Sequence, residues 1–399
     1  MKLIKQFLTI GMLGLLSLQA NAMTFGFSYH PQGESALDVA NFLKSKGSTH
    51  IRLDINKSDF NNFTNFVKVL NQNGILVTAV INTDTAWKVK KQFNMQISGV
   101  PHPVNYTTPC PGDNKDVQDN AYDDAYNQIN GLKDYVQYFE MENEITLYKD
   151  LTDTIFTMYK VQPPGGATAA SFYSNPSNFG SVCADTMAAV LRGITTAMST
   201  VKQNPNYSNL KTILGITSSG DTGFLAYMLN TKLIPFDIVG GHIYPKLNDS
   251  SLNNDPWFGP NGYIGLLKTF GKKIHINEFN CGEIYGDSPL PFINTNGSTS
   301  MNQCSLSLQK HLPEILSQDN YIEVLDAFEI KDEPTACLTP GDTGRNGAEC
   351  RFGYLFNNGT VLNSPKQILT DYTNAITTYK NSKDDTMFIT LPNGAVITF

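Results

Sequence analysis

The chain has 399 residues and a formal net charge of −7 at pH 7, and its lysines and arginines are scattered along the sequence. It therefore lacks the basic surface that nucleic acid or an anionic membrane requires, which excludes those partners and favours a neutral or modestly charged substrate. A chain of this length can form one large core or two domains.

The first 22 residues have the features of a secretory signal. Lys2 and Lys5 precede an apolar stretch over residues 7–18, and Ala20-Asn21-Ala22 follows. The stretch is too short to cross a bilayer, so we expect cleavage near Ala22 and no membrane anchor in the mature chain. The expected product is a secreted or periplasmic monomer.

Short β-branched runs alternate with helical patterns through most of the sequence. The predicted strands span residues 24–29, 49–54, 75–81, 134–141, 211–217, 236–242, 273–279 and 323–331. Amphipathic helices are predicted at 36–46, 58–71, 183–201 and 301–317. Such alternation indicates parallel strands covered by helices, and eight strands of this kind fit an α/β fold, a closed (β/α)8 TIM barrel over residues 23–381.

Two connections are too long to be simple turns, at residues 82–119 and 145–181. Both follow predicted strands, so we expect both on the catalytic face of the barrel, where long loops build a binding rim. Residues 382–399 alternate around Asn393-Gly394, which predicts a small C-terminal β-hairpin packed on the barrel.

All six cysteines lie after the predicted signal. An even number in an exported chain favours disulfides over metal ligands. The sequence contains no Cys-x-x-Cys pair and no His-Glu-x-x-His motif, so we predict no metal and no cofactor. Six cysteines allow 15 pairings. We choose the three pairs that would hold loops at the rim of the site: Cys110–Cys183, Cys281–Cys304 and Cys337–Cys350.

Two glutamates end the fourth and seventh predicted strands. Glu144 closes Tyr138-Phe139-Glu140-Met141-Glu142-Asn143-Glu144, and Glu278 lies in Ile276-Asn277-Glu278-Phe279. Two carboxylates at the carboxyl ends of barrel strands suit cleavage of a glycosidic bond, because one protonates the leaving oxygen and the other handles the developing cation. A single glutamate after a strand is commonly a solvated loop residue, so the hypothesis depends on the pair.

The pattern resembles clan A glycoside hydrolases, which are retaining barrel enzymes with catalytic glutamates on strands four and seven. The matching segments occur in the expected order: Arg52, Asn143-Glu144, His242-Ile243-Tyr244, Glu278, and residues 331–334 with 351–355. One position departs from the clan. Where the eighth strand commonly has a tryptophan under the cleaved sugar, this chain has Phe328.

The resemblance implies that Glu278 is the nucleophile. A nucleophilic carboxylate must be ionised, and Arg52 and Tyr244 are placed where they could donate to it. Two alternatives stay open. Arg52 could form an ion pair inside the barrel with Asp54 or another acid, and Tyr244 could simply line the barrel mouth.

The resemblance likewise implies that Glu144 is the acid/base and that Asn143 donates to the 2-hydroxyl of the sugar. Glu140 and Glu142 are competing acids in the same segment. Strand alternation would put all three glutamates on one face, and only Glu144 is both terminal and preceded by asparagine. His242 would shape the sugar site, or would be a core histidine.

Aromatic residues are further candidates for sugar binding. Trp87 and Trp257 are the only tryptophans, and each lies in a loop after a predicted strand. Flat rings stack on sugar faces, so both would be platforms in an elongated groove, with Phe328 in the central subsite. Each tryptophan could instead hold its own loop in place.

We therefore expect a secreted retaining β-glycosidase that hydrolyses O-glycosidic bonds of a polysaccharide or oligosaccharide. Three alternatives remain: a catalytically silent barrel that binds glycans, a transglycosylase that uses the same residues, and a two-lobed periplasmic solute-binding protein. The last would have no reason to keep Asn143-Glu144 and Glu278 at strand ends.

Overall fold

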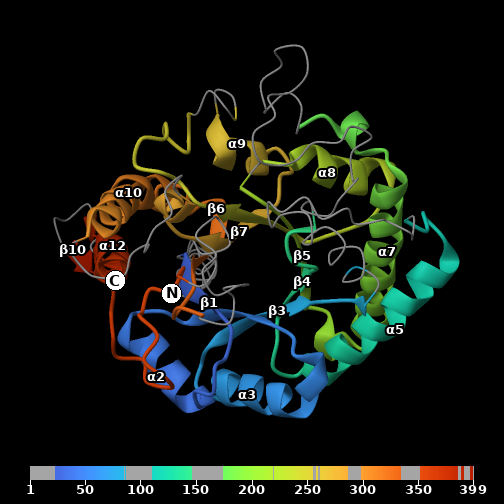
Figure 1. The fold of residues 1–399 in the computed structure, drawn as a ribbon, viewed down its shortest axis with the longest axis horizontal. Helices are drawn as coiled ribbons and strands as arrows, with labels where there is room; N and C mark the ends of the chain where they lie inside the picture. Colours follow the sequence, from blue (N-terminus) through green and yellow to red (C-terminus); the bar gives the residue numbers. More distant parts are fainter. Residues whose placement is uncertain are drawn as a thin grey trace, which may run out of the picture.

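The computed structural model describes residues 23–84, 86, 110–145, 174–218, 220–254, 258, 261–285, 298–333, 351–384, 388–390 and 396–398. Eight strands pair in chain order into a closed parallel barrel, and helices surround it (Figure 1). The predicted (β/α)8 barrel is thereby confirmed. The expected signal, residues 1–22, lies outside the described residues.

All eight predicted strands are present, with ends that differ by a few residues. They are β1 (Thr24–Tyr29), β2 (His50–Asp54), β3 (Leu76–Ile81), β4 (Tyr138–Met141), β5 (Lys211–Ile216), β6 (Ile238–Ile243), β7 (Lys273–Phe279) and β8 (Ile322–Phe328). The largest difference is at β4, which was predicted to begin at residue 134. Residues 133–135 still belong to the turn after the preceding helix, where the Val136 N–H donates to Leu132 O at 3.0 Å.

The helices include the four predicted ones. The predicted helices are α2 (Ala36–Ser45), α3 (Phe60–Gln72), α7 (Val182–Lys202) and α10 (Thr299–Leu316). The described residues also form α5 (Lys115–Leu132), α8 (Thr222–Ala226), α9 (Gly262–Lys268) and α12 (Gln367–Asp384). Serine caps set where α7 and α10 begin, because the Ser181 and Ser298 side chains accept from the backbone N–H groups of the first turn. Asn114 caps α5 in the same way, so the first long connection ends sooner than predicted.

Strands buried on both faces explain the near-continuous apolar runs of the sequence. Every residue of β6 is buried, and the strand interiors join the surrounding helices in one large apolar core. Because all eight strands are parallel, their carboxyl ends open on a single face of the barrel. Residues at these ends are therefore brought together, however far apart they are in the sequence.

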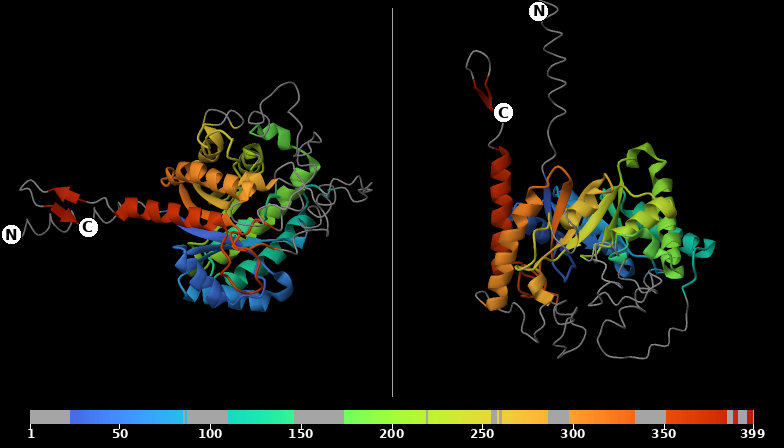
Figure 2. Two further views of the ribbon diagram at one scale, coloured as in Figure 1. Left: turned by 60° about the vertical axis from the view of Figure 1, so that its left-hand side comes forward. Right: turned by 90° about the horizontal axis from the view of Figure 1, so that it is seen from above.

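The C-terminal part of the chain extends past the barrel. Helix α12 packs along α10 and projects beyond it, as Figure 2 shows. The last two strands, β9 (Phe388–Thr390) and β10 (Val396–Thr398), pair antiparallel, which confirms the predicted hairpin. Helix α12 takes up the first residues of the predicted 382–399 segment. Packing of the hairpin on the barrel stays a prediction.

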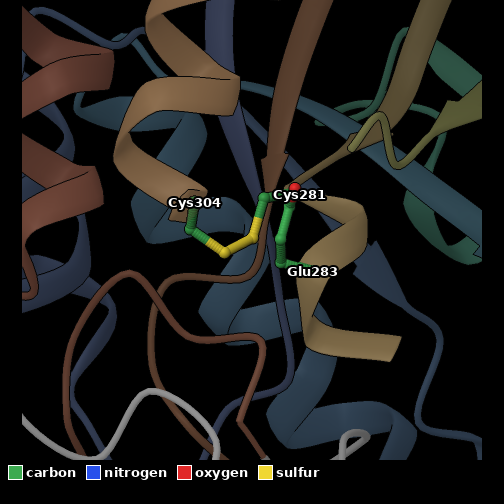
Figure 3. A group of neighbouring side chains, drawn as sticks. All are labelled: Cys281, Glu283 and Cys304. Carbon is green, nitrogen blue, oxygen red and sulfur yellow. A yellow bond between two sulfur atoms is a disulfide. The ribbon is translucent and has the colours of Figure 1, made fainter. Parts of the chain in front are cut away.

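Two of the three predicted disulfides are present. Cys110 is joined to Cys183, with Cα atoms 5.0 Å apart, and Cys281 is joined to Cys304, with Cα atoms 5.3 Å apart (Figure 3). The second bond ties the segment after β7 to α10. Disulfides of this kind fit an oxidising compartment. In the described part of the chain, no helix has the length and apolarity needed to span a membrane.

The third predicted disulfide, Cys337–Cys350, lies outside the described residues. With four cysteines paired, these two are the remaining partners among the six. Peptide mapping without reductant is expected to release one cross-linked fragment that contains Cys337 and Cys350. Alkylation of either residue in the unreduced, unfolded protein would contradict this pairing.

Candidate active site

Six predicted site residues meet at the carboxyl ends of β2, β4, β6 and β7: Arg52, Asn143, Glu144, His242, Tyr244 and Glu278. They come from positions as much as 226 residues apart, the separation between Arg52 and Glu278. The closed barrel brings them into direct contact. Their part in binding a substrate stays a prediction.

Glu278 is buried and has three polar neighbours. Arg52 Nη1 donates to Oε1 at 3.0 Å, and the Tyr244 hydroxyl donates to Oε2 at 2.5 Å. His242 Nδ1 lies 3.2 Å from Oε2. Both donors suggested from the sequence are therefore on this carboxylate.

Burial and charge act in opposite directions on Glu278. Burial raises its pKa above the ordinary value of 4.5, and the nearby carboxylate of Glu144 adds to the rise. The positive charges of His242 and Arg52 and the hydrogen bond from Tyr244 lower it. The net shift of the Glu278 pKa is upward. Arg52, His242 and Tyr244 limit this rise and thereby favour the ionised carboxylate that a nucleophile needs.

Arg52 has a second carboxylate partner, Glu140 in β4. Arg52 Nε and Nη2 donate to the two oxygens of Glu140 at 2.5 and 3.1 Å, and Nη2 also donates to Asn143 Oδ1 at 2.8 Å. The ion pair inside the barrel thus exists together with the bond to Glu278. A Cβ at Gly215 would lie 3.2 Å from Glu140 Oε1, so glycine there leaves room for the pair.

The sequence suggested Glu140 only as a rival catalytic acid. Its role as the counter-ion of Arg52 was missed. The available signal was that a buried arginine needs an anionic partner, and that Glu140 points inward from a strand two places along the sheet from β2.

Glu144 lies across the site from Glu278. Its Oε1 is 3.1 Å from His242 Nδ1, and one oxygen of Glu144 lies within 4.8 Å of one oxygen of Glu278. Burial by itself would lower the pKa of His242, but the carboxylates of Glu278 and Glu144 raise it above the ordinary value of 6.5. His242 is therefore a buried group between the two acids rather than an isolated core histidine.

The backbone after β4 departs from the extended conformation. Glu142 and Glu144 have φ values of 64° and 47°, in a region that residues other than glycine rarely adopt. The expectation that three glutamates share one face is wrong for this reason. Glu140 pairs with Arg52, whereas Glu142 accepts from the Thr83 N–H at 2.8 Å and Glu144 turns to His242. Strain of this kind is typical of functional sites.

Phe328, at the end of β8, borders the site. Its ring centroid lies 6.4 Å from that of Tyr244 and 5.5 Å from that of Phe352. The residue is partly exposed. Its part in a central subsite stays a prediction. Trp87 and Trp257 lie outside the described residues.

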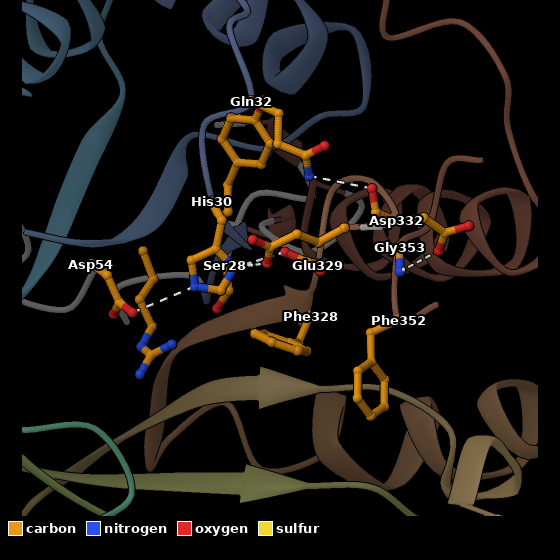
Figure 4. Close-up of polar contacts among 12 residues, drawn as sticks. Ser28, His30, Gln32, Asp54, Phe328, Glu329, Asp332, Phe352 and Gly353 are labelled. Atoms are coloured by element: carbon orange, nitrogen blue, oxygen red, sulfur yellow. Dashed lines mark hydrogen bonds and ion pairs between the residues drawn. The ribbon is translucent and has the colours of Figure 1, made fainter. Parts of the chain in front are cut away.

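A second polar cluster lies on the other side of Phe328 and was not foreseen (Figure 4). His30, after β1, has Nδ1 3.0 Å from Glu329 and 3.3 Å from Glu333, and Nε2 3.5 Å from Asp54. Burial would lower the pKa of His30, but its hydrogen bonds to the three acids raise it well above 6.5. The imidazolium is therefore the internal counter-ion of the cluster.

Glu329 gives this cluster a pH dependence. Burial raises its pKa to about 7 although His30 opposes the shift. Glu329 keeps its proton up to about pH 7 in the folded protein but releases it near pH 4.5 in the unfolded chain. The stability that Glu329 gains from staying protonated is therefore complete below pH 4.5 and is lost as the pH rises from 4.5 to 7. The loss is about 3 kcal/mol of unfolding free energy.

Glu329→Gln removes this ionisation. We expect wild-type stability to fall relative to the variant between pH 4.5 and 7, as measured by urea unfolding at several pH values. Parallel stability curves for the two proteins would contradict the assignment.

Three groups of described side chains place metal-ligand atoms close together: Glu144–His242–Glu278, His30–Glu329–Glu333 and Cys281–Glu283–Cys304. The sulfurs of the third group are joined in a disulfide and offer no thiolate (Figure 3). The first two are hydrogen-bonded sets built around one imidazole each. That the protein needs no cofactor stays a prediction.

Comparison with known proteins finds similarity of structure but not of sequence. No protein-family model and no curated protein matches the sequence. An endo-1,4-beta-xylanase of Penicillium canescens has a TM-score of 0.56 at 9% identity, over 91% of this chain and 96% of that one. A psychrophilic glycoside hydrolase family 10 endo-beta-1,4-xylanase scores 0.53 at 11% identity, over 88% and 96%. The GH53 catalytic domain of Ignisphaera aggregans scores 0.51 at 14% identity, over 89% and 96%. The predicted resemblance to clan A glycoside hydrolases is therefore confirmed at the level of the fold.

Proposed function

We propose that this protein is a secreted glycosidase that hydrolyses β-O-glycosidic bonds with retention of configuration. The observation that carries the proposal is the approach of Glu144 and Glu278 within 4.8 Å at the ends of two barrel strands. Retaining enzymes have carboxyl groups about 5 Å apart, whereas inverting enzymes need a gap of roughly 6.5–9.5 Å for a water molecule. The fold shared with glycoside hydrolases supports the same conclusion.

In the first step, a Glu278 oxygen bonds to the anomeric carbon while the bond to the leaving oxygen breaks. Glu144 gives its proton to that oxygen, which departs as an alcohol. Arg52 and Tyr244 hold Glu278 in place and favour its ionised form. Asn143 is held by Arg52, and it would donate to the sugar's 2-hydroxyl.

In the second step, Glu144 takes a proton from water as the water oxygen bonds to the anomeric carbon. The bond to Glu278 breaks, and Glu278 is again a carboxylate. Each step inverts the anomeric carbon, so the product keeps the configuration of the substrate. His242 Nδ1 lies beside both acids, so it can interact with whichever of the two carboxylates is ionised at each step.

A hydrolysis screen tests the proposal. The mature protein is incubated with β-glucans, xylans, mannans and aryl β-glycosides, and NMR follows the anomer released first. Release of the β-anomer is the expected result, and first release of the α-anomer would show inversion. Binding without hydrolysis would indicate a silent glycan-binding barrel, and products longer than the substrate would indicate transglycosylation.

Tyr244→Phe is expected to shift the pH dependence of activity. The variant loses the hydroxyl whose hydrogen bond lowers the pKa of Glu278. Glu278 then binds its proton more tightly, so the acid limb of the kcat/KM profile moves to higher pH. Tyr138→Phe is the matched control, because the Tyr138 hydroxyl donates a hydrogen bond to Glu323 near the amino end of the barrel, away from Glu278. An unshifted acid limb in Tyr244→Phe would contradict the assignment of Glu278 as the nucleophile.

A further inference from the structure

The side-chain amide of Asn280 joins three segments at the carboxyl end of the barrel. Asn280 follows β7, two residues after Glu278, and is fully buried. Its Nδ2 donates to the carbonyl oxygens of Phe328 and Phe352, the second at 2.7 Å, and its Oδ1 accepts from the Cys281 N–H at 2.7 Å. An asparagine amide has two N–H donors, and both are used here.

This amide acts where the pairing of β7 with β8 becomes irregular. The register between the two strands shifts between Ile276 and Phe279. Beyond the shift, the backbone N–H of Glu329 donates to Phe352 O at 3.2 Å, so the chain after β8 pairs with the segment around Phe352. A buried carbonyl is costly without a donor. At this irregularity, Asn280 Nδ2 donates a hydrogen bond to the carbonyl oxygen of Phe328.

The two carbonyls belong to residues whose rings pack on Tyr244. The Tyr244 ring centroid lies 5.4 Å from that of Phe352 and 6.4 Å from that of Phe328, and the two phenylalanine rings are 5.5 Å apart. The hydroxyl of Tyr244 in turn donates to Glu278. Close-packed rings transmit small shifts, so moving either phenylalanine would move the hydroxyl relative to Glu278.

We propose that Asn280 is a positioning residue, which holds the Tyr244 hydroxyl on Glu278 through Phe328 and Phe352. The assignment rests on the proposed function, in which Glu278 is the ionised nucleophile. Asn280 acts from behind the rings and does not touch the substrate. It thereby couples the end of β7 to the surface on which the sugar would rest.

The test is a double-mutant cycle between Asn280→Leu and Tyr244→Phe, read on the acid limb of the kcat/KM profile. Asn280→Leu keeps the number and branching of the side-chain heavy atoms, removes both donors and adds no charge that could act on Glu278 directly. We expect the acid limb to move to higher pH, as in Tyr244→Phe, and kcat/KM at its optimum to fall roughly 10- to 100-fold, the scale of a misplaced catalytic group. In the Tyr244→Phe background, Asn280→Leu should move the acid limb no further, because no hydroxyl remains to be displaced.

Two further variants keep the test decisive. Asn280→Ser retains one donor and should give an intermediate shift, which serves if the leucine variant fails to fold. The double variant Cys281→Ser, Cys304→Ser loosens the same segment but leaves the amide in place, so it should lower the unfolding temperature without moving the acid limb.

Two results overturn the assignment alone: an unmoved acid limb in an active Asn280 variant, or an equal further shift in the Tyr244→Phe background. A wild-type protein that hydrolyses no β-glycoside overturns the proposed function, and the positioning role falls with it.

Discussion

Glu278→Ala is expected to be almost inactive on every glycoside. Without this carboxylate no covalent intermediate forms, so the loss in kcat should be on the order of 10⁵–10⁶-fold, the scale seen when an enzyme loses its nucleophile. The loss should be the same for good and poor leaving groups, because both need the same bond to carbon. Initial rates on an aryl β-glycoside and on an oligosaccharide measure it.

The fold should survive this substitution. Arg52 keeps both of its bonds to Glu140 when Glu278 is removed, so no buried charge is left unpaired. Glu323→Gln is the control, since Glu323 lies near the amino end of the barrel beside Tyr138. Comparable unfolding midpoints with activity lost only in Glu278→Ala would support the role. Activity within tenfold of wild type in Glu278→Ala would contradict the assignment of Glu278 as the nucleophile.

Glu144→Ala is expected to depend on the leaving group. General acid help is worth roughly 10²–10⁴-fold, and an aryl glycoside with an acidic phenol needs little of it in the first step. The phenol should therefore appear in a burst, after which the covalent intermediate accumulates because no base activates water. On an oligosaccharide, whose leaving group is a poor one, the first step itself should be slow.

Azide separates the two glutamates by stereochemistry. It needs no base, so it should attack the intermediate of Glu144→Ala and restore turnover. Attack on the face opposite Glu278 yields a β-glycosyl azide from a β-glycoside. The same anion is tested on Glu278→Ala as the matched control. A β-glycosyl azide from that variant, with no β-glycosyl azide from Glu144→Ala, would mean that the two roles are reversed, because only a variant that keeps its nucleophile inverts the anomeric carbon twice.

The sequence by itself determined the barrel and the positions of the two acids in it. Strand-like runs of six to nine residues between helical patterns are local signals, and eight of them admit few arrangements other than a closed parallel barrel. Because parallel strands share one open end, glutamates after the fourth and seventh strands had to face the same site. The pairs Cys110–Cys183 and Cys281–Cys304 were selected by their place in loops at that end.

Only the tertiary structure decided which side chain meets which. Closure of the barrel gave Arg52 two carboxylates, Glu140 and Glu278, that lie 88 and 226 residues away in the chain. No periodic pattern carries that choice, since it depends on strand register and on the room left at Gly215. The positive φ of Glu142 and Glu144, which follow the fourth strand, likewise turned these two residues to different partners.

The same limit applies to the groups around Phe328. The His30 cluster and the amide of Asn280 join the ends of β1, β2, β7 and β8. Each link is a contact between distant segments whose partners are buried together. Local propensity says where a strand ends, but burial of a charge or carbonyl is satisfied only by what the folded chain brings beside it.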